Sequence, residues 1–227
     1  MKKVWLFTYP RSGNSMLSSM MLASLSNVSF ESIYKNTIDE PRLLRELGEL
    51  GVKPSAEPNW KIIKTHRWNH VPDSDKVIWL VRDGRDAMCS YWFYHLTMHK
   101  DTKFKNPIDY WKSLDGDPLN GVISQWHNHI RAVKDLVYKR DSLVLKYEDI
   151  VNNPSGEISK VGSFLSEKVD VNKLSSVTFD RLNSVNGQFF RKGKIGGFKE
   201  LPEKAVEYLE REMSSVLKMT GYGQKQK

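Results

Sequence analysis

The sequence predicts an α/β fold with a central parallel sheet and helices on both of its faces. Short apolar runs alternate along the chain with segments of helical periodicity, which is the pattern of parallel α/β proteins. The first and third apolar runs each end in a loop of small and basic residues that opens a helix. With 39% hydrophobic and 27% charged residues, the composition is that of a globular protein with a substantial core.

Four apolar runs predict the strands of the sheet. Residues 4–8 read Val-Trp-Leu-Phe-Thr, which is typical of a strand buried on both faces. Residues 76–81, Lys-Val-Ile-Trp-Leu-Val, form the clearest of the runs. The predicted strands are residues 4–8, 60–65, 76–81 and 142–147.

Helical periodicity predicts the elements between the strands. Residues 15–25 carry apolar side chains on nearly every face, so this helix should be well buried. Pro154 marks a helix start, because its fixed φ and missing N–H suit the first turn. Further helices are expected at residues 43–50, from residue 86 onward, and at residues 108–114, 121–138 and 202–218. The rest of residues 27–58 and 97–121 is expected to be irregular.

Charge and cysteine content narrow the class of protein. The formal net charge of +8 favours a phosphate-bearing or polyanionic partner. The basic residues recur in short pieces beside Gly and Ser rather than along one stripe, which suits loops converging on a small anion better than nucleic acid. The one cysteine, Cys89, excludes an internal disulfide and a cysteine-based zinc site.

The length of 227 residues predicts a single domain over residues 1–227. No signal peptide is evident, and no segment approaches the roughly 20 apolar residues of a membrane span. We therefore expect a cytoplasmic protein that binds neither membrane nor nucleic acid.

The first strand–loop–helix segment is the strongest chemical signal. Residues 8–15 read Thr-Tyr-Pro-Arg-Ser-Gly-Asn-Ser. A loop of small residues between a buried strand and a helix directs backbone N–H groups at one point, where the helix dipole also favours an anion. The loop lacks the leading Gly and the Gly-Lys pair of a Walker A loop. It favours a single 5′-phosphate with one further group, and a tight turn without a ligand is the alternative.

Three other segments carry candidate chemistry. Arg82 follows a central strand at the edge where open α/β sheets bind ligands, and Ser90 lies in the helix that follows, so the two can share an anion. An Arg–Asp network on the surface, with a Ser that faces its own helix, is the alternative there. Residues 190–199 form a basic, Gly-rich loop that can fold over a phosphate, or else a linker. Residues 64–66, Lys-Thr-His, place a cation and a titratable base at a strand end.

Together these segments resemble the sulfotransferase family, in its cytosolic and bacterial branch, from residue 4 to about residue 200. The family's 5′-phosphosulfate loop, Tyr-Pro-Lys-Ser-Gly-Thr-Thr-Trp, is similar to residues 9–16. The family's 3′-phosphate motif is similar to Arg82 with Ser90-Tyr91. Its Lys-Thr-His, Tyr-Glu-Asp, Thr-Ser-Phe and Arg-Lys-Gly-x-x-Gly motifs are similar to residues 64–66, 147–149, 177–179 and 191–196.

The resemblance implies a P-loop-type three-layer sandwich and an enzyme that moves a sulfuryl group from 3′-phosphoadenosine 5′-phosphosulfate (PAPS) to a hydroxyl or amine. The acceptor would be a small molecule, the product 3′,5′-bisphosphoadenosine (PAP), and no metal would be needed. His66 would be the general base, and Lys64 and Arg11 would stabilise developing charge. The implied donor-binding residues are Arg11, Ser12, Gly13, Asn14, Ser15, Met16, Arg82, Ser90, Tyr147, Thr178, Phe179, Arg191, Lys192 and Gly193.

Two of the chain's departures from the family in the first loop bear on donor binding. Arg11 replaces the usual Lys, which keeps the charge but substitutes a planar fork for a point ammonium. Met16 replaces a Trp that would stack on adenine, so Phe179 is the aromatic face that remains. The acceptor-side walls are expected in the irregular segments, residues 27–58 and 97–120, with Trp68, Tyr94 and Trp111 as candidate lining residues.

Two other classes of protein stay open. A small-molecule kinase using ATP and Mg²⁺ should show a Walker Lys after Gly, which this sequence lacks. A nucleic-acid-binding protein is supported by the net charge alone. A zinc site at His95 and His99 has no third ligand evident in the sequence.

Overall fold

The computed structural model describes residues 1–25, 27–32, 57–67, 71–73, 75–99, 103–115, 122–137, 139–185 and 193–223. The chain divides into two compact units. The sheet unit comprises Met1–Val81 and Leu136–Gly193, and the helical unit comprises Arg82–Asp135 and Lys194–Lys227.

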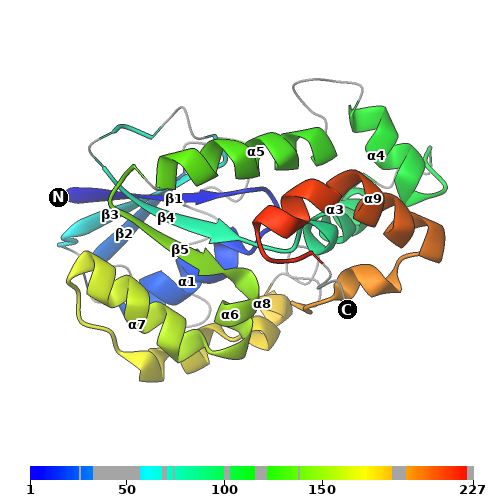
Figure 1. Cartoon of the computed structure of the whole chain (residues 1–227). Coiled ribbons are helices and arrows are strands. Elements are labelled where there is room, and N and C mark those ends of the chain that lie inside the picture. Colours follow the sequence, from blue (N-terminus) through cyan, green and yellow to red (C-terminus); the bar gives the residue numbers. More distant parts are fainter. Residues whose placement is uncertain are drawn as a thin grey trace. The chain divides into compact units, whose positions relative to one another are not determined.

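A five-stranded parallel sheet is the framework of the sheet unit (Figure 1). The strands are β1 (Lys2–Thr8), β2 (Val28–Ser32), β3 (Trp60–Thr65), β4 (Lys76–Val81) and β5 (Ser142–Lys146), in the spatial order β2-β3-β1-β4-β5. All neighbouring pairs are parallel, which confirms the predicted α/β fold class with a parallel sheet.

The register of the sheet aligns the ends of its central strands. Phe7 of β1 lies opposite Thr65 of β3, and Thr8 lies opposite Leu80 of β4. The segments that leave β1 and β3 therefore emerge side by side at one edge. Ligands of open α/β sheets bind at this carboxyl edge.

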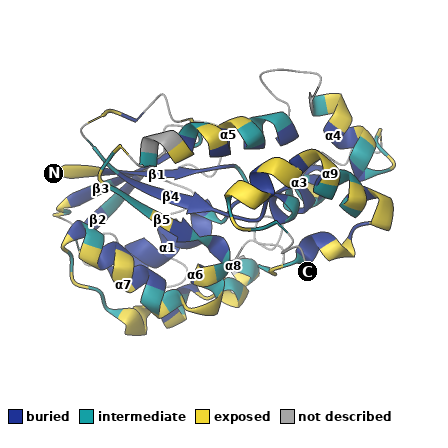
Figure 2. Cartoon of the chain, viewed as in Figure 1, coloured by how far each residue is buried: buried dark blue, intermediate teal, exposed yellow. Residues whose placement is uncertain are grey.

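Helices of the sheet unit cover one face of the sheet in Figure 1. They are α1 (Asn14–Ser24), α6 (Tyr147–Asn152), α7 (Pro154–Leu165), the 3₁₀ helix η2 (Val171–Val177) and α8 (Phe179–Val185). Every residue of α1 is buried, as its all-round apolar pattern predicted (Figure 2). Leu17 and Met21 of α1 belong to the main core with Leu6, Ile62 and Leu80 of the strands. Burial of such side chains stabilises the fold by about 1.5–3 kcal/mol each.

The helical unit contains α3 (Gly84–His99), α4 (Pro107–Asp115), most of α5 (Val122–Val137), the 3₁₀ helix η3 (Gly197–Glu200) and α9 (Glu203–Met219). A side chain at Gly84 would meet its neighbours, because a Cβ there would lie 2.6 Å from Trp126 Cζ2. Arg85 joins three segments of the unit. Its guanidinium bonds Asp83, Glu210 of α9 and the carbonyl of Tyr222, at 2.7–3.2 Å.

The structure corrects the predicted elements in two places. Residues 27–58 were expected to be irregular apart from one helix, yet residues 28–32 form the edge strand β2. Val28 and Phe30 alternate with polar residues and pack into the core, a pattern easily lost beside the polar, proline-containing segment that follows. Tyr147, predicted as the end of a strand, begins α6 instead. The predicted helix at residues 43–50 lies outside the described residues.

The other predicted elements that lie in the described residues agree with the structure to within a few residues. The helices α6, η2, α8 and η3 were not predicted. Among the described helices, none has the length and apolar composition that a membrane span requires.

Candidate active site

The loop between β1 and α1 folds in a way that requires a glycine. Arg11 has φ of 67° and Gly13 has φ of 93°, so the loop uses the left-handed region twice. This region costs a non-glycine residue roughly 1–2 kcal/mol, which Arg11 bears. At Gly13 a Cβ would also lie 2.7 Å from Tyr147 Cε2. The aromatic ring of Tyr147 thus supports the loop and leaves no room for a side chain at Gly13.

The loop presents hydrogen-bond donors that the fold does not use. Ser12 is 1% exposed, and its Oγ has no hydrogen-bond partner among the described residues. The N-cap of α1 is Gly13, which has no side chain to accept from the first backbone N–H groups of the helix. Buried hydroxyls and helix-start amides normally find partners, and an anion satisfies both. The loop therefore has the form of an anion-binding site.

Lys64 adds a buried cation beside this loop. It is the penultimate residue of β3 and is 5% exposed. Burial, and then the neighbouring Arg11 cation, lower the pKa of Lys64 to about 8. Among the residues that the structure describes, no carboxylate forms an ion pair with Lys64. A buried cation that lies beside a second cation favours an anionic ligand.

His66 follows β3 and is held by the end of β1. Its Nδ1 lies 2.7 Å from the carbonyl oxygen of Thr8. Because a carbonyl only accepts, Nδ1 carries the proton, and the lone pair of the neutral ring lies on Nε2. Burial, and then the Lys64 cation, lower the pKa of His66 to about 3, although the hydrogen bond to Thr8 opposes this shift. His66 is therefore neutral at physiological pH in the protein without ligand.

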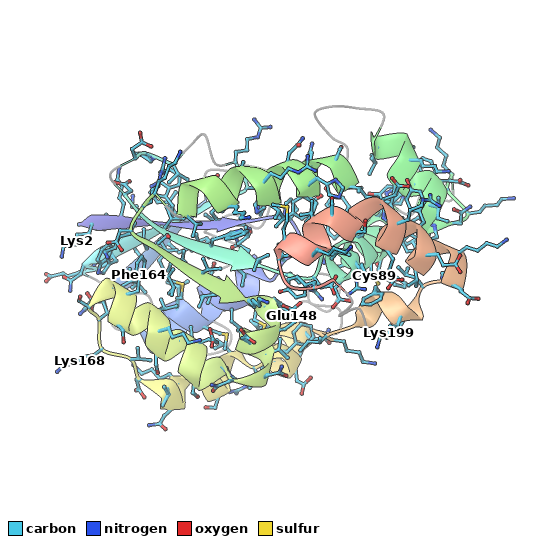
Figure 3. All side chains as sticks on the ribbon, viewed as in Figure 1. Lys2, Cys89, Glu148, Phe164, Lys168 and Lys199 are labelled. Atoms are coloured by element: carbon cyan, nitrogen blue, oxygen red, sulfur yellow. The ribbon has the colours of Figure 1, made fainter. Side chains whose placement is uncertain are left out.

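Three predicted donor-binding residues have packing roles in the structure. Met16 is part of the main core, as is Tyr147 beneath the loop, and Ser15 is buried in the first turn of α1. Glu148, labelled in Figure 3, follows Tyr147 in the first turn of α6.

The predicted adenine-side residues lie together in the sheet unit. Phe179 opens α8 and is half-buried, and Thr178 precedes it and is exposed. A Cβ at Gly193, which has φ of 61°, would lie 2.6 Å from Phe179 Cγ. The structure thus brings Gly193 against the ring of Phe179. Arg191 and Lys192 lie outside the described residues.

Arg82 is buried in the helical unit within a polar cluster. Its Nη2 donates to the carbonyl of Lys194 at 3.2 Å and lies 3.8 Å from the carboxylate of Asp86. Ser90 lies two turns further along α3 and is half-buried. Arg82 thus lies beside Asp86 in a buried Arg–Asp contact rather than in the surface network that was the alternative, and its bond to Lys194 joins it to the basic loop of residues 190–199.

Asp86 is a residue of this cluster that sequence reasoning missed. Its two carboxylate oxygens accept from the backbone N–H groups of Gly196 and Phe198, at 2.8 and 2.9 Å. Cys89, labelled with Lys199 in Figure 3, contacts the same segment through a 3.3 Å hydrogen bond to the carbonyl of Gly197. The available signal was a carboxylate one helical turn after Arg82.

Of the remaining candidates for acceptor lining and metal binding, some pack against other aromatic rings and others lie outside the described residues. Trp111 is fully buried and stacks on Tyr208. His95 stacks on Tyr110 with ring centroids 4.2 Å apart. Among the described residues, no three His, Cys, Asp or Glu side chains are grouped so as to hold a metal ion. Trp68 lies outside the described residues.

Fold and site together define an α/β enzyme of the P-loop type, with a strand–loop–helix that has the form of an anion site and a neutral histidine beside the buried Lys64. The profile of the sulfotransferase domain family matches residues 1–221. The chain belongs to the sulfotransferase family and is a PAPS-dependent sulfotransferase, as the sequence predicted.

Named relatives and solved structures agree with this assignment. Mouse sulfotransferase 1B1 is 26% identical over 216 residues, which cover 88% of this chain and 69% of the relative. Human sulfotransferase 1C2 is 24% identical over 85% of this chain and 75% of its own length.

Two solved structures share the fold at lower identity. A mouse sulfotransferase in complex with PAP has a TM-score of 0.70 at 18% identity, covering 94% of this chain and 84% of that one. The sulfotransferase domain of the Synechococcus PCC 7002 olefin synthase has a TM-score of 0.64 at 18% identity, covering 99% and 96%.

Proposed function

We propose that the protein transfers the sulfuryl group of PAPS to a hydroxyl or amine of a small molecule, with His66 as the general base. The observation that carries the proposal is the hydrogen bond from His66 Nδ1 to the Thr8 carbonyl, beside the buried Lys64. This bond leaves the basic lone pair on Nε2, the ring nitrogen that can accept a proton from an acceptor. A retinol dehydratase of the same fold is known with androsterone and PAP, which supports a small-molecule acceptor.

In the proposed step, the acceptor oxygen attacks sulfur in line with the bond between sulfur and the phosphate-bridging oxygen. The acceptor loses its proton to His66 Nε2, the new oxygen–sulfur bond forms, and the old one breaks. The bridging oxygen leaves with the electron pair as part of PAP. Lys64 and Arg11 would stabilise the charge that builds on the bridging oxygen and the sulfonate.

The low pKa of His66 is compatible with this role because the donor is an anion. The value of about 3 is set by burial and by the Lys64 cation without a ligand. Negative charge bound beside Lys64 offsets that cation and raises the pKa of His66 toward the range of an effective base.

We further propose that residues 11–16 hold the 5′-phosphosulfate, and that Arg82, Ser90 and the basic loop bind the 3′-phosphate. The Ser12 hydroxyl, which has no partner in the part of the chain that the structure describes, and the polar cluster at Arg82 support these roles. Tyr147 would act by shaping the loop, and Thr178 and Phe179 would lie at the adenine. A single sulfotransferase domain is also proposed, supported by a family match that covers both units.

Kinetics of His66→Ala test the proposal. Loss of a general base should lower kcat by roughly 10²- to 10⁴-fold. Affinity for PAP should change little, because the base contacts the acceptor. A rate close to that of the unmodified enzyme would reject His66 as the base. Titrations with PAP, with ATP and Mg²⁺, and with a DNA oligomer separate sulfotransferase, kinase and nucleic-acid binding, and only PAP should bind at micromolar concentration.

A further inference from the structure

Asn14 forms a buried chain of contacts that joins α1 to the end of β1. Its Nδ2 donates to Thr8 Oγ1 at 2.9 Å, and its Oδ1 accepts from Ser18 Oγ at 3.2 Å. All three residues are at most 6% exposed. The amide nitrogen and the amide oxygen of Asn14 therefore each form a hydrogen bond within the protein.

The same threonine holds the histidine. His66 Nδ1 lies 2.7 Å from the Thr8 carbonyl and 3.3 Å from Thr8 Oγ1. Two oxygens of one residue thus face the ring nitrogen that carries the proton. The rotamer of Thr8 determines whether its Oγ1 faces His66 Nδ1. The hydrogen bond from Asn14 to Oγ1 fixes that rotamer.

We propose that Asn14 and the Thr8 hydroxyl are positioning residues that orient the imidazole of His66. Ser18, Asn14, Thr8 and His66 form one line from the helix that opens at the donor loop to the base. The family has a threonine where this chain has Asn14, so the line is a feature of this sequence. The inference rests on the proposed role of His66.

A double-mutant cycle on kcat tests the proposal. Thr8→Val removes the hydroxyl and keeps the branched shape and the backbone carbonyl, and Asn14→Ala removes its partner. Each should lower kcat by about 3- to 10-fold, the usual worth of one hydrogen bond. If Asn14 acts through the Thr8 hydroxyl, the double variant should be no slower than the worse single one. The rates are measured with PAPS and a simple phenol, whose hydroxyl has a pKa of about 10 and so requires a base.

The His66→Ala background separates the inference from the proposed function. There, Thr8→Val and Asn14→Ala should have no further effect on kcat, because the group that they orient is missing. If His66→Ala itself keeps the normal rate, the proposed base is wrong. If His66→Ala is slow and Thr8→Val still lowers its rate by the same factor, the positioning role is wrong.

Two variants control for disturbance of the fold. Ser19→Ala removes a buried hydroxyl of α1 whose one hydrogen bond within the described part of the chain is to the carbonyl of Ser15, and it should leave kcat unchanged. Thr8→Ser restores the hydroxyl and should return kcat to within about 2-fold of the normal value. If Asn14→Ala does not fold, the Thr8 variants test the positioning role instead, together with the ¹⁵N chemical shifts of the His66 ring, which report its tautomer. Equal kcat for Thr8→Val and the unmodified enzyme, with the Nδ1–H tautomer retained, would overturn the proposal.

Discussion

Lys64 should make the affinity for PAP depend on pH above neutrality. Burial and the Arg11 cation lower the pKa of Lys64 to about 8 in the protein without ligand, against an ordinary 10.5. A phosphate group beside the ammonium would return the pKa toward its ordinary value. At pH 9, about nine-tenths of the free protein would hold a neutral Lys64, which must take up a proton before it pairs with the ligand.

The expected magnitude follows from these two pKa values. Between pH 7 and pH 9 the affinity for PAP should fall about tenfold, with uptake of nearly one proton per PAP bound at pH 9. Calorimetry in buffers of different ionisation enthalpy measures both quantities. In Lys64→Arg the cation does not titrate, so the pH dependence should disappear. An affinity that is flat from pH 7 to 9 in the unmodified protein, or an equal slope in Lys64→Arg, would refute the reasoning.

The same pKa predicts a trend in stability. Because the pKa of Lys64 is lower in the folded protein, the unfolded chain binds more protons between pH 8 and 10.5. The contribution of Lys64 to the free energy of unfolding should therefore rise over that interval, by about 3 kcal/mol in total at 1.36 kcal/mol per pH unit. Comparison with Lys64→Met isolates this contribution from other groups that titrate there.

Two further substitutions test the anion sites. Gly13→Ala should lower the free energy of unfolding by about 2–4 kcal/mol, from the left-handed φ and the close ring of Tyr147, and thermal unfolding measures it. Gly196→Ala is the matched control, because it has φ of 73° but no atom closer than 3.9 Å, and an equal loss in both would contradict the role of Tyr147. Arg82→Ala and Ser90→Ala should each weaken the binding of PAP by about 1.5–3 kcal/mol. The binding of its 3′-dephospho analogue should weaken much less. Equal losses for the two nucleotides would contradict a role of these residues in 3′-phosphate binding.

Much of the fold could be predicted from local patterns. The runs at β1 and β4 are apolar on both faces, and β3 carries Ile62 and Ile63 on opposite faces, so hydrophobicity alone located them. β2 was missed because only Val28 and Phe30 carry its signal, and their burial depends on α1, a contact that a local pattern does not contain. Helix α8 and η2 are short and have similarly little periodicity.

In the candidate site, too, the features set by neighbouring residues could be predicted from the sequence, and those set by long-range contacts could not. The glycine and the small residues of the first loop predicted an anion site, because that chemistry depends on residues adjacent in the chain. The orientation of His66 depends on the Thr8 carbonyl 58 positions away, and the loop shape depends on the ring of Tyr147. Such contacts follow from strand register, which the sequence pattern leaves undetermined.

Asp86 holds part of the basic loop in place through its hydrogen bonds. It accepts two backbone N–H groups from residues 196–198 and lies near Arg82, which in turn donates to the Lys194 carbonyl. These contacts fix residues 194–198, the second half of the basic loop. Removal of the Asp86 carboxylate would leave the part-buried Gly196 N–H and the buried Phe198 N–H without their acceptor, and the buried one costs about 1–3 kcal/mol.

Hydrogen exchange of individual amides tests this role directly. Asp86→Ala should speed exchange of the Gly196 and Phe198 amides by at least about tenfold, and Asp86→Asn should release one of them more than the other, since its amide keeps one acceptor oxygen. Cys89→Ala is the control, because it removes a contact to the Gly197 carbonyl in the same segment and leaves both amides bonded. If Asp86 orders the segment for the nucleotide, PAP affinity should fall in step with the loss of protection across the Asp86 variants. Weakened binding with both amides still protected would instead mean that Asp86 acts through the charge on Arg82, which lies 3.8 Å away.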